Sequence, residues 1–207
     1  MLAHQLAEYR DRPGLLVLGL PRGGVPVAYE IAGALTAELD VLIVRKLGVP
    51  YQPELAFGAI ASAGATVLNG DIVAAAELSP AQVQSIVRTE RIELARREQD
   101  YRGGRGALTV RGRTVVIVDD GLATGASMRA AIAALRTLQP AKIVVAVPVA
   151  PADAVEEFRR LADDFICLEA PREFHSVGWW YLAFEQTSDA EVLALLDAAR
   201  IHKPSAA

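Results

Sequence analysis

Short, continuous runs of Val, Ile and Leu are the most regular pattern in the chain. They occupy residues 15–20, 41–44, 115–118, 143–149 and, more weakly, 165–168. Apolar runs without polar alternation are typical of strands that are covered on both faces of a parallel sheet. Helix-like segments lie between them at residues 25–37, 126–138 and 152–161. The alternation predicts an α/β fold with an open, mainly parallel sheet flanked by helices.

A further helix is predicted to begin at Ser79. Ser79 suits the N-cap, Pro80 suits the first helical position, and Gln82 completes the spacing of a capping box. The helix should run to about residue 101, and the mixed charges along its second half indicate a solvated face rather than a phosphate or nucleic-acid contact. Residues 103–106, Gly-Gly-Arg-Gly, follow no strand, so we expect a flexible connector rather than a phosphate loop.

The segment from residue 47 to residue 69 has no helical periodicity, because Pro and Gly interrupt it repeatedly. Residues 57–61 and 66–68 are apolar enough to pair as a small hairpin. The segment follows a strand that we expect in the central sheet. It is therefore predicted to cover a site.

Composition and charge narrow the class of protein. With 207 residues, 52% of them hydrophobic and 22% charged, the chain is predicted to be one globular domain. The net charge of −4 does not indicate a nucleic-acid partner. No apolar run approaches the roughly 20 residues of a membrane span, and the charged first 12 residues are unlike a secretory signal, so we expect a cytoplasmic protein. Cys167 is the only cysteine, which excludes an internal disulfide. Residues 202–207 read as a frayed tail.

Two adjacent acids end the strongest predicted strand. Residues 115–118 lead directly to Asp119 and Asp120, and ligands of open α/β sheets bind beyond the carboxyl ends of the strands. The loop at residues 121–127 contains two Gly and two hydroxyl side chains and precedes a helix, a combination that suits an anion. Carboxylates beside an anion site fit a ligand with a phosphate at one end and hydroxyls at the other. A ribose 5-phosphate unit has this form.

Three other interpretations of the segment compete. A P-loop requires Lys after its last Gly, where this chain has Ala126. A receiver domain requires a phosphoacceptor Asp at the end of a later strand, but Asp163 and Asp164 precede their predicted strand. The acids could also merely cap the loop, although one acid would suffice for that.

Residues 115–128, Val-Val-Ile-Val-Asp-Asp-Gly-Leu-Ala-Thr-Gly-Ala-Ser-Met, closely resemble the signature of type I phosphoribosyltransferases, which bind 5-phosphoribosyl-1-pyrophosphate. The resemblance implies that Asp119 and Asp120 hold the ribose hydroxyls and make at most a weak metal contact, through water or those hydroxyls. It also implies a 5-phosphate site at Ala123, Thr124, Gly125, Ala126 and Ser127. Purine-salvage members often have Asp where this chain has Ala123. That candidate proton-transfer group is missing.

Two further segments resemble the family's pyrophosphate site. Arg22, Gly23 and Gly24 end the first apolar run and resemble a loop in which a strained or cis peptide exposes backbone donors, although a tight strand-to-helix turn is the alternative. Arg45 and Lys46 follow another expected strand and resemble an Arg-Lys pair of adenine-type members. We expect one of them to meet the leaving pyrophosphate, and the alternative is a solvated loop entrance.

The remaining parts of the predicted site are a loop and a hood. Residues 47–70 resemble the mobile loop that closes over the family's active sites, where Glu54 is a candidate for proton transfer or for orienting a cation. An exposed loop Glu explains Glu54 almost equally well. Residues 170–186 resemble the hood that selects the acceptor, with His175, Val177 and Trp179 as candidate contacts. Packing or a dimer interface is an equal alternative for the tryptophans.

The resemblance implies a single domain, residues 1–207, that is a phosphoribosyltransferase using Mg²⁺ and acting as a homodimer. It would transfer 5-phosphoribose from 5-phosphoribosyl-1-pyrophosphate to a nitrogenous-base acceptor and release pyrophosphate. The candidate catalytic residues are Arg22, Lys46 and Glu54. The alternatives are a regulatory protein that senses the activated ribose or a nucleotide, and a related hydrolysis or transfer to an unusual acceptor. The sequence does not identify the acceptor.

Overall fold

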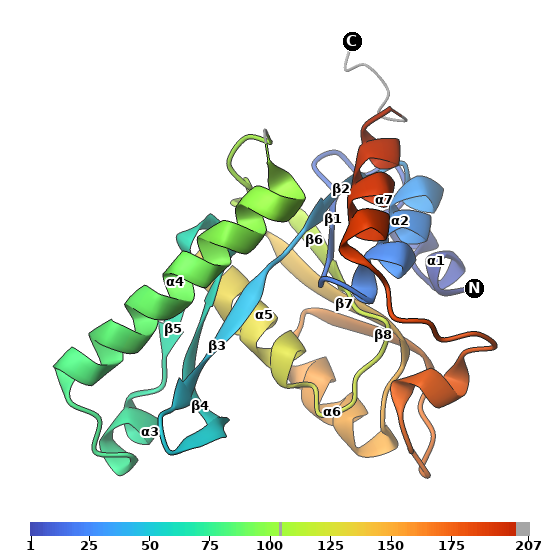
Figure 1. The fold of residues 1–207 in the computed structure, drawn as a ribbon. Coiled ribbons are helices and arrows are strands. Elements are labelled where there is room, and N and C mark those ends of the chain that lie inside the picture. Colours follow the sequence, from blue (N-terminus) through green and yellow to red (C-terminus); the bar gives the residue numbers. More distant parts are fainter. Residues whose placement is uncertain (104, 202–207) are drawn as a thin grey trace.

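The computed structural model describes residues 1–103 and 105–201, except for the side chains of Glu54 and Ile201. A five-stranded parallel sheet forms its centre (Figure 1). In spatial order the strands are β2 (Glu38–Val41), β1 (Leu16–Gly19), β6 (Thr114–Val118), β7 (Lys142–Val149) and β8 (Asp164–Glu169). All four pairings are parallel, which confirms the predicted fold class.

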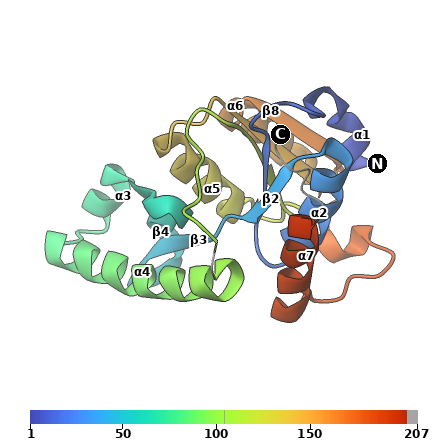
Figure 2. The ribbon, with the colours of Figure 1, turned by 90° about the horizontal axis from the view of Figure 1, so that it is seen from above.

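Helices cover both faces of this sheet, as the continuous apolar runs predicted (Figure 2). One face packs on α1 (Leu2–Gln5), α2 (Gly24–Leu35) and α7 (Asp189–Ile201), and the other packs on α5 (Ala126–Thr137) and α6 (Ala152–Leu161). Neighbouring residues of a strand alternate between the two cores: Val17 and Val116 face α2, whereas Leu16 and Ile117 face α5.

A second, antiparallel sheet extends to one side of the central sheet (Figure 1). It consists of β3 (Val44–Val49), β4 (Gln52–Ala61) and β5 (Thr66–Leu68), and is followed by α3 (Gly70–Ala75) and α4 (Pro80–Arg102). The predicted hairpin is confirmed, because Gly58 pairs with Leu68 and Ile60 pairs with Thr66.

The prediction of one strand at residues 41–44 was wrong. Val41 ends β2 in the central sheet, and Val44 begins β3 in the antiparallel sheet. Ser62, which is fully buried, holds the junction between them: its hydroxyl accepts from the N–H of Ile43 at 3.1 Å, and its N–H donates to the carbonyl of Ile43 at 2.9 Å. Arg45, expected at the end of a central strand, therefore lies inside β3.

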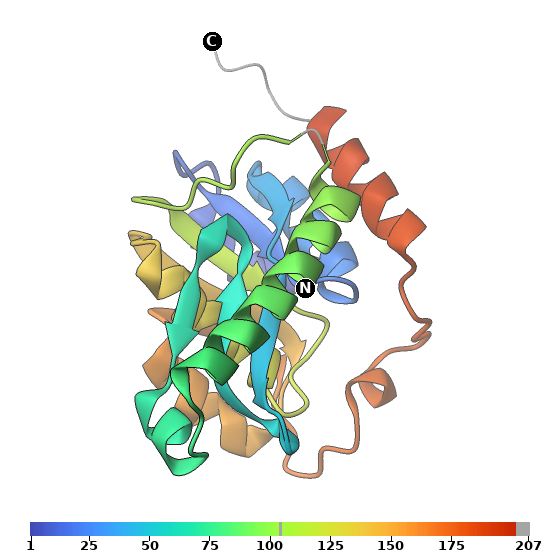
Figure 3. The ribbon, with the colours of Figure 1, turned by 60° about the vertical axis from the view of Figure 1, so that its left-hand side comes forward.

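Helix α4 begins with the predicted capping box. The backbone N–H of Gln82 donates to the hydroxyl of Ser79 at 3.3 Å, and the side chain of Gln82 accepts from the N–H of Ser79 at 2.9 Å. Figure 3 shows α4 lying along the antiparallel sheet. Several of its charged residues pair with one another, as Glu93 and Arg97 do at 2.9 Å.

Three 3₁₀ turns complete the described elements, at Ala7–Tyr9, Ser62–Gly64 and Val177–Trp180. Helices α1, α3 and α7 were not predicted. Within the described ranges, no helix is both long and apolar enough to cross a bilayer.

Candidate functional site

The site lies beyond the carboxyl ends of β1 and β6, two neighbouring strands of the central sheet. Gly19 and Val118 are directly paired, and the N–H of Leu20 donates to the carbonyl of Val118 at 2.9 Å. The loop containing Arg22 and the loop containing Asp119 therefore leave the sheet side by side, in the place where open α/β folds bind ligands.

The glycines of the first loop pack directly on the acids of the second. A Cβ at Gly23 would lie 2.0 Å from Oδ2 of Asp120, and a Cβ at Gly24 would lie 2.5 Å from the carbonyl oxygen of Val118. Only glycine permits this approach. The peptide bond between Pro21 and Arg22 is cis. The structure thus brings together two segments that are about a hundred residues apart in the sequence.

Burial sets the electrostatics of the acid pair. Asp119 and Asp120 are half-buried, and Oδ1 of Asp119 accepts from the N–H of Asp120 at 3.0 Å. Burial, together with the charge of Asp120, raises the pKa of Asp119 to about 8, and burial also raises the pKa of Asp120. Neither carboxylate forms an ion pair with any described residue. The pair is suited to hydroxyl groups or to a cation brought by a ligand.

The predicted phosphate loop is exposed to solvent on one side and is held on the other by packing and hydrogen bonds. Gly125 has a left-handed φ of 70° and packs on Phe158, whose Cζ would lie 2.7 Å from an added Cβ. A guanidinium N–H of Arg129 donates to the carbonyl of Thr124 at 2.6 Å, and a second donates to Oε2 of Glu157 at 2.7 Å. The exposed residues Ala123, Thr124 and Ser127 precede or begin α5, whose first backbone N–H groups have no helical partner.

Residues Arg129, Glu157 and Phe158 were missed from the sequence. Arg129 follows Gly125 by four residues, a spacing that indicates a contact with the loop. Its partner Glu157 lies on α6 and has no such local indication.

The hood is attached to the acidic loop by Tyr181. Its hydroxyl donates to the backbone carbonyl of Asp120 at 2.6 Å. Val177, one of the predicted hood residues, packs on Gly121, where an added Cβ would lie 2.7 Å from its Cγ1. Burial raises the pKa of the Tyr181 hydroxyl, and the two nearby carboxylates raise it further, so it remains a hydrogen-bond donor.

An open pocket of about 720 Å³ separates the hood from the Arg22 loop. Arg22, Asp120, Tyr181 and Phe184 line it. None of the predicted hood residues His175, Val177 and Trp179 lines it: the rings of His175 and Trp179 lie 5.4 Å apart, and Trp179 is 73% exposed. The aromatic residues that do line the pocket are Tyr181 and Phe184, which follow the tryptophans by a few residues and were not among the predicted contacts.

Arg22 also contacts the start of α7. Its Nη1 lies 3.7 Å from Oδ1 of Asp189, which accepts a hydrogen bond from the hydroxyl of Tyr101 at 2.5 Å. Neither Asp189 nor Tyr101 was predicted. The contact links the loop to both α7 and α4.

The remaining predicted residues lie on the antiparallel sheet. Arg45 faces α4, where its Nε donates to Glu90 at 2.7 Å. Lys46 is exposed and, as the next residue of β3, points to the opposite face. Arg22 pairs with Asp189 and Arg45 with Glu90, so the two arginines have different partners. The backbone of Glu54 belongs to β4, but its side chain lies outside the described residues.

Comparisons with known proteins identify the family. The family model described as phosphoribosyl transferase domain matches residues 2–181. Proteins of Mycobacterium tuberculosis strains CDC 1551 and H37Rv, provisionally named phosphoribosyl transferases, are each 51% identical over 198 residues, which cover 96% of this chain and 44% of theirs. The chain thus spans less than half the length of these curated relatives. The crystal structure of TT1426 from Thermus thermophilus is similar with a TM-score of 0.83 and 41% identity, over 94% of this chain and 92% of that one.

Proposed function

This chain belongs to the type I phosphoribosyl transferase family, and from that membership we propose that it transfers 5-phosphoribose from 5-phosphoribosyl-1-pyrophosphate to a ring nitrogen of a small acceptor. The observation that carries the proposal is the packing of Gly23 against Asp120, because it joins an acid pair for sugar hydroxyls to a loop suited to pyrophosphate. A capping role would require neither the second acid nor this contact.

In the proposed reaction the bond between C1 of the ribose and the pyrophosphate oxygen breaks, and its electron pair leaves with pyrophosphate. The acceptor nitrogen forms the new bond to C1 and loses its proton to water or to a phosphate oxygen. Residue 123 is Ala, so its side chain takes no part in that proton transfer. Positive charge develops on C1 and the ring oxygen, and catalysis would come mainly from positioning and from stabilising the leaving group.

The proposed contacts of the donor follow the two loops. Asp119 and Asp120 accept hydrogen bonds from the ribose hydroxyls, while the N–H groups at the start of α5 bind the 5-phosphate. Arg22 binds the pyrophosphate, which would replace its contact with Asp189. Lys46 is the better second cation, because its side chain is exposed whereas Arg45 is paired with Glu90. Glu54 remains a prediction.

Mg²⁺ is the proposed metal, and the donor set fits it in a limited way. The described residues contain no group of three or more His, Cys, Asp or Glu that could hold a metal ion. Mg²⁺, however, is commonly held by one or two carboxylates together with substrate phosphates and water. Asp119 and Asp120 would hold it, directly or through water and ribose hydroxyls. When bound, the ion would neutralise charge on the leaving pyrophosphate.

The proposed acceptor site is the pocket of about 720 Å³ beside Asp120. Tyr181 and Phe184 supply aromatic surface on which a planar base can stack. His175, Val177 and Trp179 do not line this pocket, so the proposed acceptor contacts are Tyr181 and Phe184.

Pyrophosphate release on mixing the protein with 5-phosphoribosyl-1-pyrophosphate, Mg²⁺ and a panel of nitrogenous bases tests the proposal. The Asp119→Asn, Asp120→Asn double variant should lose binding of the activated ribose. A matched control, Asp153→Asn with Glu156→Gln, removes two exposed carboxylates from α6 and should bind normally. Full affinity in the first variant would refute the sugar site. Binding without pyrophosphate release for any base would favour a sensing protein instead.

A further inference from the structure

A second cavity, of about 1360 Å³, lies near the amino ends of β1 and β2. Leu15, which precedes β1, and Glu38, which begins β2, line it, whereas the candidate active site lies beyond Gly19 and Val118 at the other ends of the strands. The last residues of α7 and the connector that follows α4 form further walls. The cavity is therefore separate from the site of the proposed reaction.

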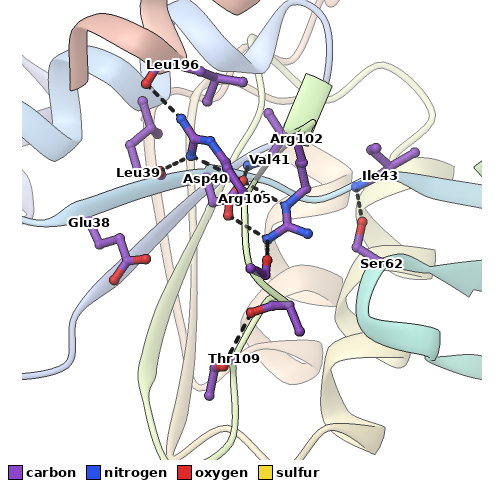
Figure 4. Close-up of polar contacts among 12 residues, drawn as sticks. Glu38, Leu39, Asp40, Val41, Ile43, Ser62, Arg102, Arg105, Thr109 and Leu196 are labelled. Atoms are coloured by element: carbon purple, nitrogen blue, oxygen red, sulfur yellow. Dashed lines mark hydrogen bonds and ion pairs between the residues drawn. The ribbon is translucent and has the colours of Figure 1, made fainter. Parts of the chain in front are cut away.

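A buried ionic cluster with more positive than negative charge forms one wall (Figure 4). Asp40 accepts from Nε and Nη2 of Arg102 at 3.1 and 3.0 Å, and its Oδ1 lies 3.5 Å from Nη1 of Arg105. The three side chains are only 7%, 10% and 12% exposed, in the order Asp40, Arg102 and Arg105. One carboxylate thus faces two guanidinium groups. A charge that is buried without full compensation is costly, and burial accordingly lowers the pKa of Arg105.

The other arginines of the lining have acidic partners. The described charged residues of the lining are five arginines and three carboxylates, namely Arg12, Arg102, Arg105, Arg113, Arg200, Glu30, Glu38 and Asp40. Arg12 and Arg200 pair with carboxylates just outside the lining, Glu8 at 4.0 Å and Asp197 at 3.6 Å. The excess positive charge is therefore the one at Asp40, Arg102 and Arg105. A phosphate monoester carries roughly two negative charges near neutral pH, and guanidinium groups match its oxygens in pairs.

We propose that this cavity binds a phosphate monoester of a small molecule, with the phosphate at Arg102 and Arg105 and with Arg200 at the rim. Ligand pockets commonly measure about 300 to 1000 Å³, so the cavity has room for the organic part of such a ligand. The proposal does not depend on the transferase reaction, because none of these residues belongs to the candidate active site.

The competing explanation is that the arginines only hold the connector in place. Arg105 does donate to the backbone carbonyls of Leu39 and Leu196, at 3.0 and 2.7 Å, and so ties the connector to β2 and α7. A purely structural role predicts lower stability on substitution, with no dependence on an added anion. Ligand binding adds a stabilisation that increases with anion concentration.

The test uses thermal unfolding in a background that disables the active-site loops, Arg22→Gln with Ser127→Asp. Ser127 is exposed at the start of α5, where an acid is tolerated and would repel phosphate. Glycerol 3-phosphate should raise Tm in a saturable way, inorganic phosphate should do so more weakly, and glycerol should not. Absence of any anion-dependent shift in this background would overturn the proposal.

Four substitutions in the same background locate the binding. Arg105→Gln should weaken apparent affinity for glycerol 3-phosphate about tenfold or more. Arg200→Glu changes an exposed rim residue and should weaken it about tenfold without preventing folding. Asp40→Asn removes the competing carboxylate and should strengthen it.

Arg88→Glu, an equal charge change on exposed α4, is the matched control and should leave affinity unchanged. If Arg105→Gln fails to fold, Arg200→Glu decides the outcome. Equal affinity in Arg200→Glu and Arg88→Glu would overturn the assignment.

Discussion

Replacing Gly23 by Ala should disable the sugar site while leaving the fold intact. The added Cβ would lie 2.0 Å from Oδ2 of Asp120, and real Cβ atoms essentially never approach another atom closer than 3.0 Å. The carboxylate must therefore retreat by about 1 Å. The backbone at Gly23 has φ −59° and ψ −30°, which Ala adopts without strain, so the free energy of unfolding should change by less than about 1 kcal/mol.

The expected effect on the reaction is large, because a displacement of 1 Å can cost about 100-fold in rate. That corresponds to about 2.7 kcal/mol of transition-state stabilisation. Steady-state kinetics should show kcat/KM for the activated ribose reduced by this factor, and thermal unfolding should show Tm almost unchanged.

Two other glycines, both in α2, provide controls. Gly33→Ala adds a Cβ with no atom within 4 Å, so it should stabilise the helix by roughly 0.5 to 1 kcal/mol without affecting activity. Gly24→Ala meets the backbone oxygen of Val118 at 2.5 Å, which cannot retreat as a side chain can, and should instead lower stability. If Gly23→Ala keeps kcat/KM within about threefold of the wild type, the placement of Asp120 against this loop is not needed for sugar binding.

Three further predictions concern the hood, the acid pair and the hairpin. Tyr181→Phe removes the hydrogen bond to the carbonyl of Asp120, so it should lower the free energy of unfolding by about 1 kcal/mol. It should also raise KM for the acceptor more than KM for the activated ribose. Equal changes in both KM values would contradict the proposed acceptor site. Because the pKa of Asp119 is raised from 3.8 to about 8, the folded chain holds this proton more tightly than the unfolded chain, and the resulting stability is lost as pH rises across that interval. Tm should fall with pH more steeply in the wild type than in Asp119→Asn, and parallel profiles would refute the assignment. Lys46→Gln should leave Tm unchanged but raise KM for the activated ribose about tenfold, and an unaltered KM would exclude Lys46 from the pyrophosphate site.

Local patterns predicted most elements because each had a local physical cause. The capping box at Ser79 and the apolar face of α5 are readable from residues three or four positions apart. The apolar run at residues 41–44 misled because Leu42 and Ile43 are buried while the chain passes from one sheet to the other. Burial is visible in the sequence, but the sheet to which a buried residue belongs is not.

Helix α7 shows a second limit. Its buried residues Val192 and Leu196 have helical spacing. Alanines and exposed apolar residues such as Leu193 lie between and around them, so the sequence shows no clear apolar face. Its position against α2 places Asp189 beside Arg22. Without the helix, that contact was not predictable.

The sequence alone determined that the chain has a parallel sheet covered on both faces, with Asp119 and Asp120 at the carboxyl end of a central strand. These features depend on residues that are adjacent or one helical turn apart. Only the tertiary structure decided that Gly23 lies against Asp120 and that Tyr181 holds the hood to the same residue. It also decided that Arg102 and Arg105 share Asp40, away from the candidate active site. Contacts of this kind depend on strand order, register and the packing of distant segments, which no local pattern encodes.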